Sequence, residues 1–404
     1  MLTVDPVRLA RRQVEIDRVR LRRFPDLFEH KVARMVGSPL ALLRGSAPLF
    51  YEFLEVHPAL TEGPPGEGWL VGDAHLENFG AYRTGSLKVA ETRASHSQEN
   101  VVFDLNDFDD AFVGPWRFDV LRLLTSLVLG GREMGVDGRR ALELCDALLD
   151  AYVGAVFHKK RVPSGPLVVT RLVDKVRART RAELLDARTR IVRGTRRFVR
   201  GPRYADLSPK LRARAEKAFA KYGKKLSRAD RVPAGTLDVI DAAFRVAGTG
   251  SLGCLRVALL VQGKGGRDGA WIFDMKAQGI PSSACLVRPP RLEPAERVVT
   301  ALNACLARPP RMIGATKLRG ESMFVRRLAP QEDKLDLANL ASIDLEPLAR
   351  HLGALLGVAH RTGATRPPRR IWNADDRAGL VARAIALAGM HESMYLAYCD
   401  LVRR

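Results

Sequence analysis

Two predicted strands of this chain each end abruptly in a group of carboxylate and amide side chains. The first strand, Trp69 to Val71, ends at residues 72–78, which read GDAHLEN. The second strand, Val101 to Leu105, ends at residues 106–110, which read NDFDD. Proteins commonly present their chemistry on loops that a rigid scaffold positions. A fold that accommodates both segments therefore places two polar, acidic loops at strand ends.

The residue types in these loops favour a hard divalent cation. Oxygen ligands without Cys or paired His suit Mg²⁺ rather than zinc. Asp73, followed five residues later by Asn78 and then by a distant Asp107, is an arrangement used for phosphoryl transfer. We expect Asp73 to orient the acceptor hydroxyl or take its proton, Asn78 and Asp107 to bind Mg²⁺, and Asp109 to support them. The alternative is that Asp73 and Asn78 cap a turn and that residues 104–110 form a solvated loop.

A glycine-rich segment lies much later in the chain, at residues 248–253, which read GTGSLG. A dinucleotide-binding fingerprint requires a helix directly after the glycines. Here the run from Leu255 to Val261 is typical of a strand. Strand, glycine loop, strand is the kinase order, in which the loop covers the ATP phosphates. The candidate nucleotide-binding residues of this loop are Gly248, Gly250, Ser251 and Gly253.

Lys276 ends an apolar strand 23 residues after Gly253. A lysine at such a position is costly to bury without a partner, so we expect it to contact an anion. An ATP phosphate and a structural carboxylate are both compatible with the sequence. The helix that follows offers Glu293 and Glu296 as partners, and we favour Glu296. Gln278 stands where an acidic residue is expected after the lysine.

The first motif, together with the DFD sequence at residues 107–109, resembles the catalytic and metal-binding loops of the aminoglycoside phosphotransferase branch of the protein-kinase-like fold. The resemblance implies ATP and Mg²⁺ as cofactors, and a catalytic group of Asp73, His75 and Lys276. It also implies that Asp119 braces the catalytic loop without reacting.

The order of the motifs is reversed relative to ordinary kinases, in which the glycine loop and lysine precede the catalytic loop. The resemblance therefore implies a circular permutation, with the break between a helix ending near His360 and the strand entering Gly72. Chain breaks at surface loops are tolerated in many folds. The interval of 29 residues between Asn78 and Asp107 is long, and it predicts an extra hairpin.

The whole chain also resembles the bacterial DUF2252 family over roughly residues 30–400. This family name implies no activity. The segments that carry the resemblance are SP at 38–39, RGSA at 44–47, GDAHLENFG at 72–80, FDLNDFD at 103–109, GPW at 114–116 and the glycine pattern at 248–253.

We expect an α+β protein with a two-lobed, circularly permuted, kinase-like fold, in which the C-lobe is mainly helical and the N-lobe is rich in strands. Helix is expected over residues 6–57, 117–155, 178–190 and 208–225, and strand at 87–89. The expected organisation is N-terminal helices at 1–68, catalytic and metal loops at 69–165, a basic helical connector at 166–235, a β-rich N-lobe at 236–335 and C-terminal helices at 336–404.

The net charge of +21 is concentrated in one segment. Residues 171–228 contain 20 basic and 5 acidic residues, a net charge of +15. Three interpretations remain open: a solvated Arg-rich connector with internal salt bridges, a docking surface for an acidic or phosphorylated partner, and a nucleic-acid-binding surface. Aromatic residues for base stacking are sparse in this segment, which disfavours nucleic acid.

The cysteine and hydropathy patterns exclude several classes of protein. Five scattered cysteines without a CxxC pair argue against a zinc ribbon or a thioredoxin-type site. No run approaches the ~18 apolar residues of a membrane span, and the N-terminus has no apolar signal region. We therefore expect a cytoplasmic protein without a membrane partner.

The function expected from these features is ATP- and Mg²⁺-dependent phosphotransfer to a hydroxyl-bearing small molecule or protein. AMP transfer by the same residues is a variant of this expectation. The alternatives are an inactive nucleotide-binding scaffold and a nucleic-acid-binding protein that uses residues 171–228.

Overall fold

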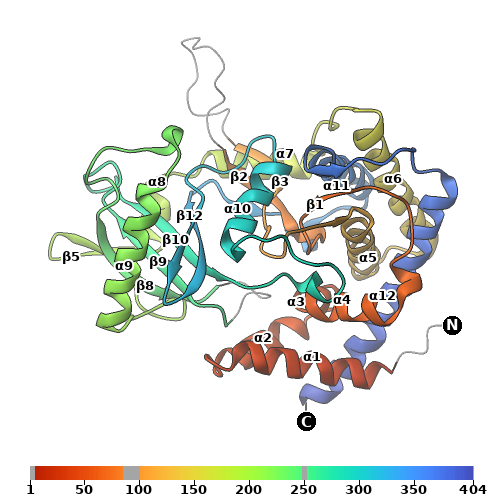
Figure 1. Ribbon diagram of the computed structural model, residues 1–404, viewed down its shortest axis with the longest axis horizontal. Coiled ribbons are helices and arrows are strands. Elements are labelled where there is room, and N and C mark those ends of the chain that lie inside the picture. Colours follow the sequence, from red (N-terminus) through yellow and green to blue (C-terminus); the bar gives the residue numbers. More distant parts are fainter. Residues whose placement is uncertain (1–4, 85–100, 248–252, 404) are drawn as a thin grey trace.

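The computed structural model of the chain describes residues 5–84, 101–247 and 253–403. The fold is α+β, about 50% helical and 19% strand, with several small antiparallel sheets. This confirms the expected class. Figure 1 shows the largest sheet on one side of the molecule and the longest helices on the other, with strands β1, β2 and β3 between them.

Helices from both ends of the chain build the helical side. These are α1 (Pro6–Leu21), α2 (Leu27–Met35), α3 (Pro39–Gly45), α4 (Ala47–Val56), α5 (Arg117–Glu133), α6 (Gly138–Phe157), α11 (Ser342–Thr362) and α12 (Ala374–Arg403). The first of them begins at Pro6, where the Asp5 carboxylate caps the helix by accepting hydrogen bonds from the amides of Val7 and Arg8. The predicted helical segment 6–57 is thus four helices.

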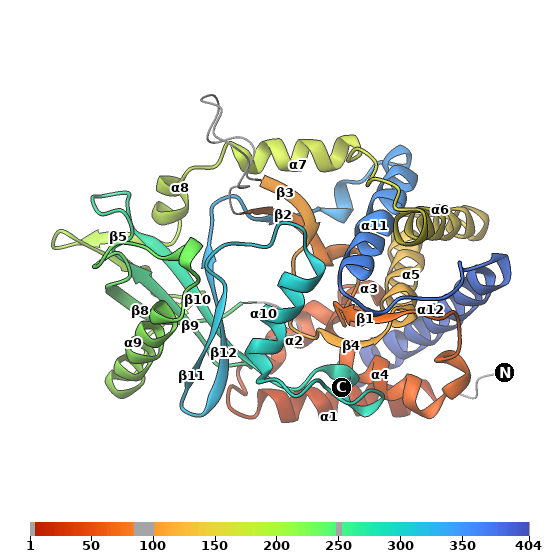
Figure 2. The same cartoon turned by 45° about the horizontal axis from the view of Figure 1, so that its top comes forward.

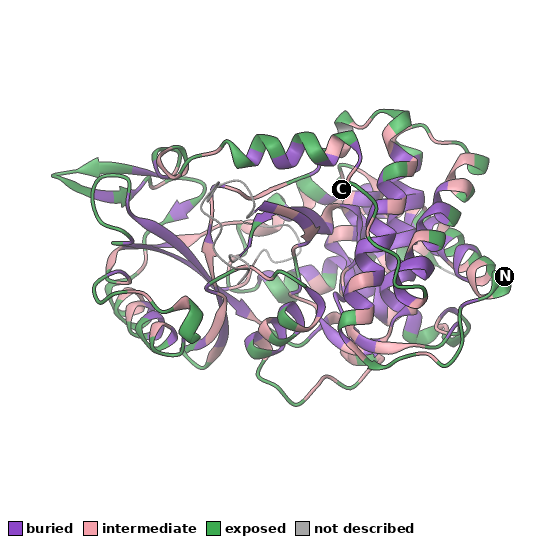
Figure 3. Ribbon diagram, turned by 90° about the horizontal axis from the view of Figure 1, so that it is seen from above, coloured by how far each residue is buried: buried purple, intermediate pink, exposed green. Residues whose placement is uncertain are grey.

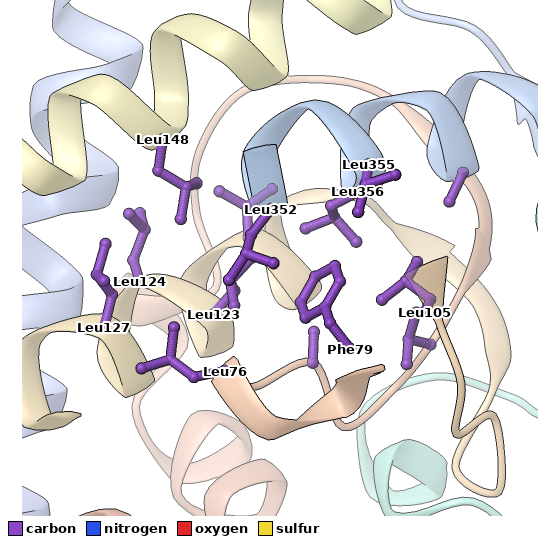
Figure 4. Close-up of a cluster of buried hydrophobic side chains, with 14 of the residues drawn as sticks. Leu76, Phe79, Leu105, Leu123, Leu124, Leu127, Leu148, Leu352, Leu355 and Leu356 are labelled. Atoms are coloured by element: carbon purple, nitrogen blue, oxygen red, sulfur yellow. The ribbon is translucent and has the colours of Figure 1, made fainter. Parts of the chain in front are cut away.

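The main hydrophobic core lies where α5, α6 and α11 meet (Figures 3 and 4). Gly353 of α11 lies against the backbone of Leu148 in α6, where a Cβ would collide with the Leu148 carbonyl. This close approach lets the leucines of the three helices interdigitate below the polar loops. The side chains that fill the interface are Leu123, Leu124, Leu127, Leu148, Leu352, Leu355 and Leu356.

The largest sheet has six antiparallel strands in the order β11-β12-β10-β9-β8-β7. Their bounds are β7 (Tyr204–Ala205), β8 (Val239–Arg245), β9 (Arg256–Val261), β10 (Trp271–Gln278), β11 (Gly314–Leu318) and β12 (Glu321–Leu328). Helix α9 (Pro209–Lys224) covers one face, where Phe219 stacks edge-on against Phe273 at 4.9 Å between ring centroids. Helix α10 (Pro294–Cys305) lies between this sheet and the helical side (Figure 2).

The basic segment is not the purely helical connector expected from the sequence. After α7 (Leu167–Arg177) and α8 (Arg181–Asp186), the chain forms a hairpin of β5 (Thr189–Val192) and β6 (Thr195–Phe198). Arg193 and Gly194 both have positive φ, as a two-residue hairpin turn requires. The helix predicted over 178–190 is therefore wrong beyond Asp186, because this turn pairs the following residues as strands.

Two three-stranded sheets hold the acidic loops. One has the order β14-β1-β4 and the other β13-β2-β3. Their strands are β1 (Glu67–Leu70), β2 (Phe79–Arg83), β3 (Val101–Leu105), β4 (Phe112–Pro115), β13 (Asp333–Lys334) and β14 (Ala364–Arg366). The short 3₁₀ helices are η1 (Pro58–Leu60), η2 (Leu76–Asn78), η3 (Arg228–Asp230), η4 (Ser282–Cys285) and η5 (Leu337–Asn339).

Strands β2 and β3 pair antiparallel between Asn78 and Asp107, and residues 85–100, which make up most of the interval where an extra hairpin is expected, lie outside the described residues. The strand expected at 87–89 lies outside the described residues. All five cysteines are free thiols. Within the described ranges, no helix is long and apolar enough to cross a membrane.

Candidate active site

The two acidic loops touch each other through Gly72. This residue has φ of +83°, and a Cβ on it would collide with the backbone carbonyl of Asp110. The Gly72 carbonyl accepts a hydrogen bond from the buried Tyr51 hydroxyl at 2.6 Å. A second link joins the loops where the Asn106 amide donates to the Asn78 carbonyl at 3.1 Å. The ends of β1 and β3 are thereby held side by side.

Asp119 braces the first loop, as its resemblance implied. Its carboxylate is fully buried and accepts hydrogen bonds from the amides of Val71 at 2.7 Å and Gly72 at 2.9 Å. His360 Nε2, at the end of α11, lies 3.1 Å from the same carboxylate. The loop thus takes its position from α5 on one side and from α11 on the other.

Asp73 projects from this braced loop and is contacted by a buried arginine. Arg122 Nε of α5 donates to Asp73 Oδ1 at 2.6 Å, and Arg122 Nη2 donates to the Leu43 carbonyl at 2.9 Å. Burial raises the pKa of Asp73 to about 7, with the charge of Arg122 opposing the rise. A carboxyl group with a pKa near neutrality is suited to accepting and releasing a proton.

His75 lies beside Asp73, with Nε2 3.9 Å from Asp73 Oδ2. The imidazole is buried, and its Nδ1 has no hydrogen-bond partner among the described residues. Burial, reinforced by the positive charge of Arg44, holds the pKa of His75 well below its usual range. His75 is therefore neutral near pH 7.

The residues expected to hold Mg²⁺ converge at the same place. Asn78 Nδ2 donates to the carbonyls of Asp73 at 2.9 Å and Asp107 at 3.2 Å. Its Oδ1 is buried and has no hydrogen-bond partner within the described part of the chain. The Asp107 side chain is exposed to the adjoining cavities. An orphaned amide oxygen next to a carboxylate fits a hard cation such as Mg²⁺.

No group of three or more His, Cys, Asp and Glu side chains gathers as a metal cluster among the described residues. The donors available from the protein at this point are thus few. Mg²⁺ is commonly held by one or two carboxylates plus substrate phosphates, and this sparse donor set suits that mode.

Lys276 of β10 reaches across to the second acidic loop and forms an ion pair with Asp109. Gln278 Nε2 donates to the other Asp109 oxygen at 2.6 Å, so this glutamine also holds the second acidic loop in place. Burial lowers the pKa of Lys276 to about 8, and the charge of Asp107 opposes this effect. The lysine and the acidic loop are 167 residues apart in sequence.

The expected pairing of Lys276 with Glu296 is wrong. Glu296 lines a separate cavity beside Tyr222 of α9, and Glu293 pairs with Lys317 at 2.9 Å. The next residue of α10, Arg297, is buried and turned toward the site instead. Its guanidinium donates to the carbonyls of Asp109 at 2.8 Å and Gly279 at 3.1 Å, and also contacts the Ala111 carbonyl.

Two adjoining cavities meet at these residues. The central cavity, of about 590 Å³, is lined by Asp73, His75 and the acidic loop. The inner cavity, of about 320 Å³, extends between β10, β12 and β2. Both are lined by Asp107, Asp109, Lys276 and Lys334.

The glycine-rich segment is only partly described. Gly248, Gly250 and Ser251 lie outside the described residues. Gly253 has φ of +90° and packs against Arg20 and Leu21 of α1, where a Cβ would approach the Arg20 carbonyl at 2.8 Å. Its neighbour Cys254 lines the central cavity.

The sequence profile of a bacterial family, described as "Uncharacterized protein conserved in bacteria (DUF2252)", matches residues 23–401. The chain belongs to the DUF2252 family. No curated protein and no solved structure matches it. The matched range contains both acidic loops, the Lys276 strand and the end of α11.

Several side chains at this DUF2252 site were missed by sequence reasoning. Arg122 and Arg297 are both buried in amphipathic helices, and Lys334 closes one wall of the two cavities. A signal for Arg122 was present, since it interrupts the apolar run Leu121–Leu129. A charged residue inside such a run is buried only with partners.

Proposed function

We propose that this protein is an ATP- and Mg²⁺-dependent phosphotransferase with a circularly permuted, kinase-like architecture. The observation that carries the proposal is the ion pair between Lys276 and Asp109. In kinases, a lysine on a strand under the glycine loop and an aspartate of the metal loop act on the same phosphates. Here Lys276 and Asp109 line both cavities, and Asp73 lines the central cavity with them.

The neighbourhood of β14 supports the permuted order. This strand follows α11 directly and pairs with β1, and the Trp69 amide donates to the Gly363 carbonyl at 2.9 Å. The end of α11 therefore lies beside the strand that leads into Asp73. A connection between these neighbouring strands would restore the ordinary kinase order, with the catalytic loop after the helix.

The proposed reaction assigns roles to Asp73, Arg122 and Lys276 and to the residues that would hold Mg²⁺. The acceptor hydroxyl oxygen forms a bond to the γ-phosphorus of ATP, the bond from that phosphorus to the bridging oxygen breaks, and ADP leaves. The hydroxyl proton passes to the Asp73 carboxylate, which Arg122 holds in place. Lys276 neutralises phosphate charge. Bound at Asn78 and Asp107, Mg²⁺ would supply further neutralisation of the phosphate oxygens.

The test is ADP formation by the purified full-length protein with Mg²⁺ and a panel of hydroxyl compounds and proteins. We expect Asp73→Asn to reduce turnover by roughly 10²–10⁴-fold, the range of general-base catalysis, without loss of ATP binding. Asp107→Asn should weaken Mg²⁺ binding and so raise the Mg²⁺ concentration that turnover requires. Asp146→Asn, an exposed carboxylate on α6, is the matched control and should retain full activity.

Full ATP turnover by folded Asp73→Asn and Asp107→Asn variants would contradict the mechanism. A second outcome distinguishes the scaffold alternative, which predicts thermal stabilisation by ATP without turnover on any acceptor. The mass of the modified acceptor separates phosphoryl transfer from AMP transfer, since the two groups differ in mass.

A further inference from the structure

Basic side chains from four separate segments line the central cavity around Asp73. They are Arg20 of α1, Arg34 of α2, Arg44 of α3 and Lys334 of β13. Only Lys334 also lines the inner cavity. The three arginines thus line the cavity that also holds Asp73 and do not line the inner cavity. In the proposed reaction the central cavity receives the acceptor.

Two of these four cations, Arg20 and Lys334, form no salt bridge with a carboxylate of the described residues. Arg44 shares its Nη1 with Glu77 at 2.7 Å, whereas its Nε is buried without a hydrogen-bond partner. Positive charge concentrated in a concave site raises the local concentration of anions.

Three of the four aspartates of the same cavity are engaged by other donors, whereas Asp107 is close enough to Lys334 to act on it electrostatically. Asp73 is engaged by Arg122, and Asp109 is engaged by Lys276. Asp110 Oδ1 accepts a hydrogen bond from the Ser282 amide at 2.7 Å. Each of these three carboxylates thus faces a donor outside the set of Arg20, Arg34, Arg44 and Lys334.

His75 supplies a second and independent indication of a ligand. Its imidazole is only 6% exposed, lines the same cavity and has an Nδ1 without a partner among the described residues. Arg44 and Lys334 are both close enough to His75 to act on it electrostatically. A buried polar atom without a partner costs free energy, and an oxygen-rich ligand at this point would satisfy it.

The helices that carry the arginines are held against the rest of the molecule. Leu21 of α1 packs on Gly253, and Arg23 pairs with Glu321 of β12 at 2.5 Å. Phe24 stacks on Phe244 of β8 at 4.9 Å between ring centroids. Figures 1 and 2 show α1 and α2 lying along the molecule from α12 toward the large sheet. The positions of the arginines are therefore set by contacts on both sides of the cavity.

We propose that the acceptor is a small hydroxyl compound that already carries an anionic group, a phosphate monoester or a carboxylate, bound by Arg34, Arg44 and Lys334 beside Asp73. This inference rests on the proposed phosphotransferase function. The guanidinium groups favour a phosphate or carboxylate because their planar donors match its oxygens. The anionic group anchors the compound while its hydroxyl reaches Asp73.

The first experiment measures binding of inorganic phosphate and of acetate to the full-length protein loaded with Mg²⁺ and a non-hydrolysable ATP analogue. We expect phosphate to bind, and Arg44→Gln and Lys334→Gln each to weaken it by roughly tenfold, the effect of losing one charge-assisted hydrogen bond. Affinity for the ATP analogue should stay within about twofold in Arg44→Gln, because Arg44 does not line the inner cavity. Lys317→Gln, at an exposed lysine outside both cavities, is the matched control.

Glu77→Gln distinguishes anion binding by Arg44 from a structural role. This change removes the carboxylate that competes for Arg44, so phosphate should bind more tightly than in the wild type. A purely structural Arg44–Glu77 pair predicts that both variants are impaired alike, and that result would overturn the proposal. Unchanged phosphate binding in Arg44→Gln and Lys334→Gln would overturn it as well.

The second experiment compares ADP formation with matched acceptors, such as glycerol against glycerol 3-phosphate and glycerate, and glucose against glucose 6-phosphate. We expect turnover only with the anionic member of a pair, and the phosphate and carboxylate arms separate the two anionic groups. Turnover of neutral alcohols with no effect of Arg44→Gln would contradict the acceptor class and leave phosphotransfer intact. Phosphate binding that depends on Arg44 without any ATP turnover would instead overturn the proposed function.

Discussion

Two groups of basic side chains in this protein differ in what they face. In the basic segment, residues 171–228, arginines turn back toward the body of the protein: Arg200 and Arg212 both contact the buried carboxylate of Asp241, at 3.1 and 3.4 Å. In the central cavity, Arg20 and Lys334 face solvent-accessible space. Seven of the 20 basic residues in this segment form an ion pair within the described residues, and the buried Asp241 is shared by three of them. A positive charge is informative about ligands only once its partner is known.

Asp241→Asn tests this comparison with the largest expected effect. The carboxylate is 1% exposed, and its removal leaves the guanidinium groups of Arg200 and Arg212 without their buried counter-charge. We expect the free energy of unfolding to fall by about 3–5 kcal/mol, measured by denaturant titration. Asp73→Asn is the matched change in the cavity. Removal of the Asp73 charge leaves the buried Arg122 guanidinium without its counter-charge, but burial raises the pKa of Asp73 and offsets part of that loss, so we expect a smaller fall in stability than at Asp241. Equal destabilisation by both changes would remove the distinction.

His391 of α12 sharpens the comparison as a buried group with no ionic partner. Its Nδ1 lies 2.9 Å from the Leu387 carbonyl, and burial lowers its pKa to about 4, below the ordinary value of 6.5. Between these two pH values the unfolded chain binds a proton that the folded protein does not. Stability should therefore fall as the pH drops from 6.5 to 4, by about 3 kcal/mol in total, with no further contribution below pH 4.

The measurement is the free energy of unfolding of wild type and His391→Gln across this range. The difference between the two proteins should shrink steadily as the pH falls. A difference that does not vary with pH would show that His391 titrates normally in the folded state.

Gly72→Ala tests the contact between the two acidic loops. The new Cβ would meet the Asp110 carbonyl, and the backbone at Gly72 has a φ of +83° that side chains rarely adopt. We expect a loss of about 1–3 kcal/mol in unfolding free energy, together with a larger proportional loss of ATP turnover. Gly235→Ala is the control, because Gly235 has a similar φ of +80° and its Cβ would meet only Asp238 Oδ2, at an ordinary contact distance of 3.8 Å. Equal turnover in the two variants would argue against a role for the loop contact.

The smallest effect is expected at the exposed arginines of the basic segment. Arg190 and Arg193 of the β5–β6 hairpin have no ion pair within the described residues. The double change Arg190→Gln and Arg193→Asn should alter stability by less than about 0.5 kcal/mol and leave ATP turnover intact. Fluorescence polarisation with short RNA and DNA measures the nucleic-acid alternative directly. Tight, salt-sensitive binding that this double change abolishes would favour it.

Features carried by local sequence were predicted correctly. The strands before the two acidic loops follow from hydropathy patterns, and the position of Asp119 at the start of α5 follows from the resemblance of a short motif. They depend on residues that lie within a few positions of each other. The hairpin of the basic segment was missed because its turn at Arg193 and Gly194 rests on two positive φ values, and the surrounding arginines resemble a solvated helix.

Partners separated by long stretches of chain were predicted less well. Lys276 was expected to meet an anion, yet the choice of Asp109 over Glu296 required the fold. Successive residues of a helix point about 100° apart, so the rotation of α10 decides whether Glu296 or Arg297 faces the site. Packing of Ala295, Val298 and Leu302 sets that rotation, and it turns Arg297 inward.

The sequence by itself determined the membership of the chain in an α+β class, the two acidic strand ends and the lysine strand that follows them late in the chain. Only the tertiary structure decided which charges meet. It paired Lys276 with Asp109, brought Arg122 into contact with Asp73, and turned Arg200 and Arg212 of the basic segment toward Asp241. The physical reason is that strand and loop propensities act over a few residues, whereas an ion pair depends on distances in space that only the packed core sets.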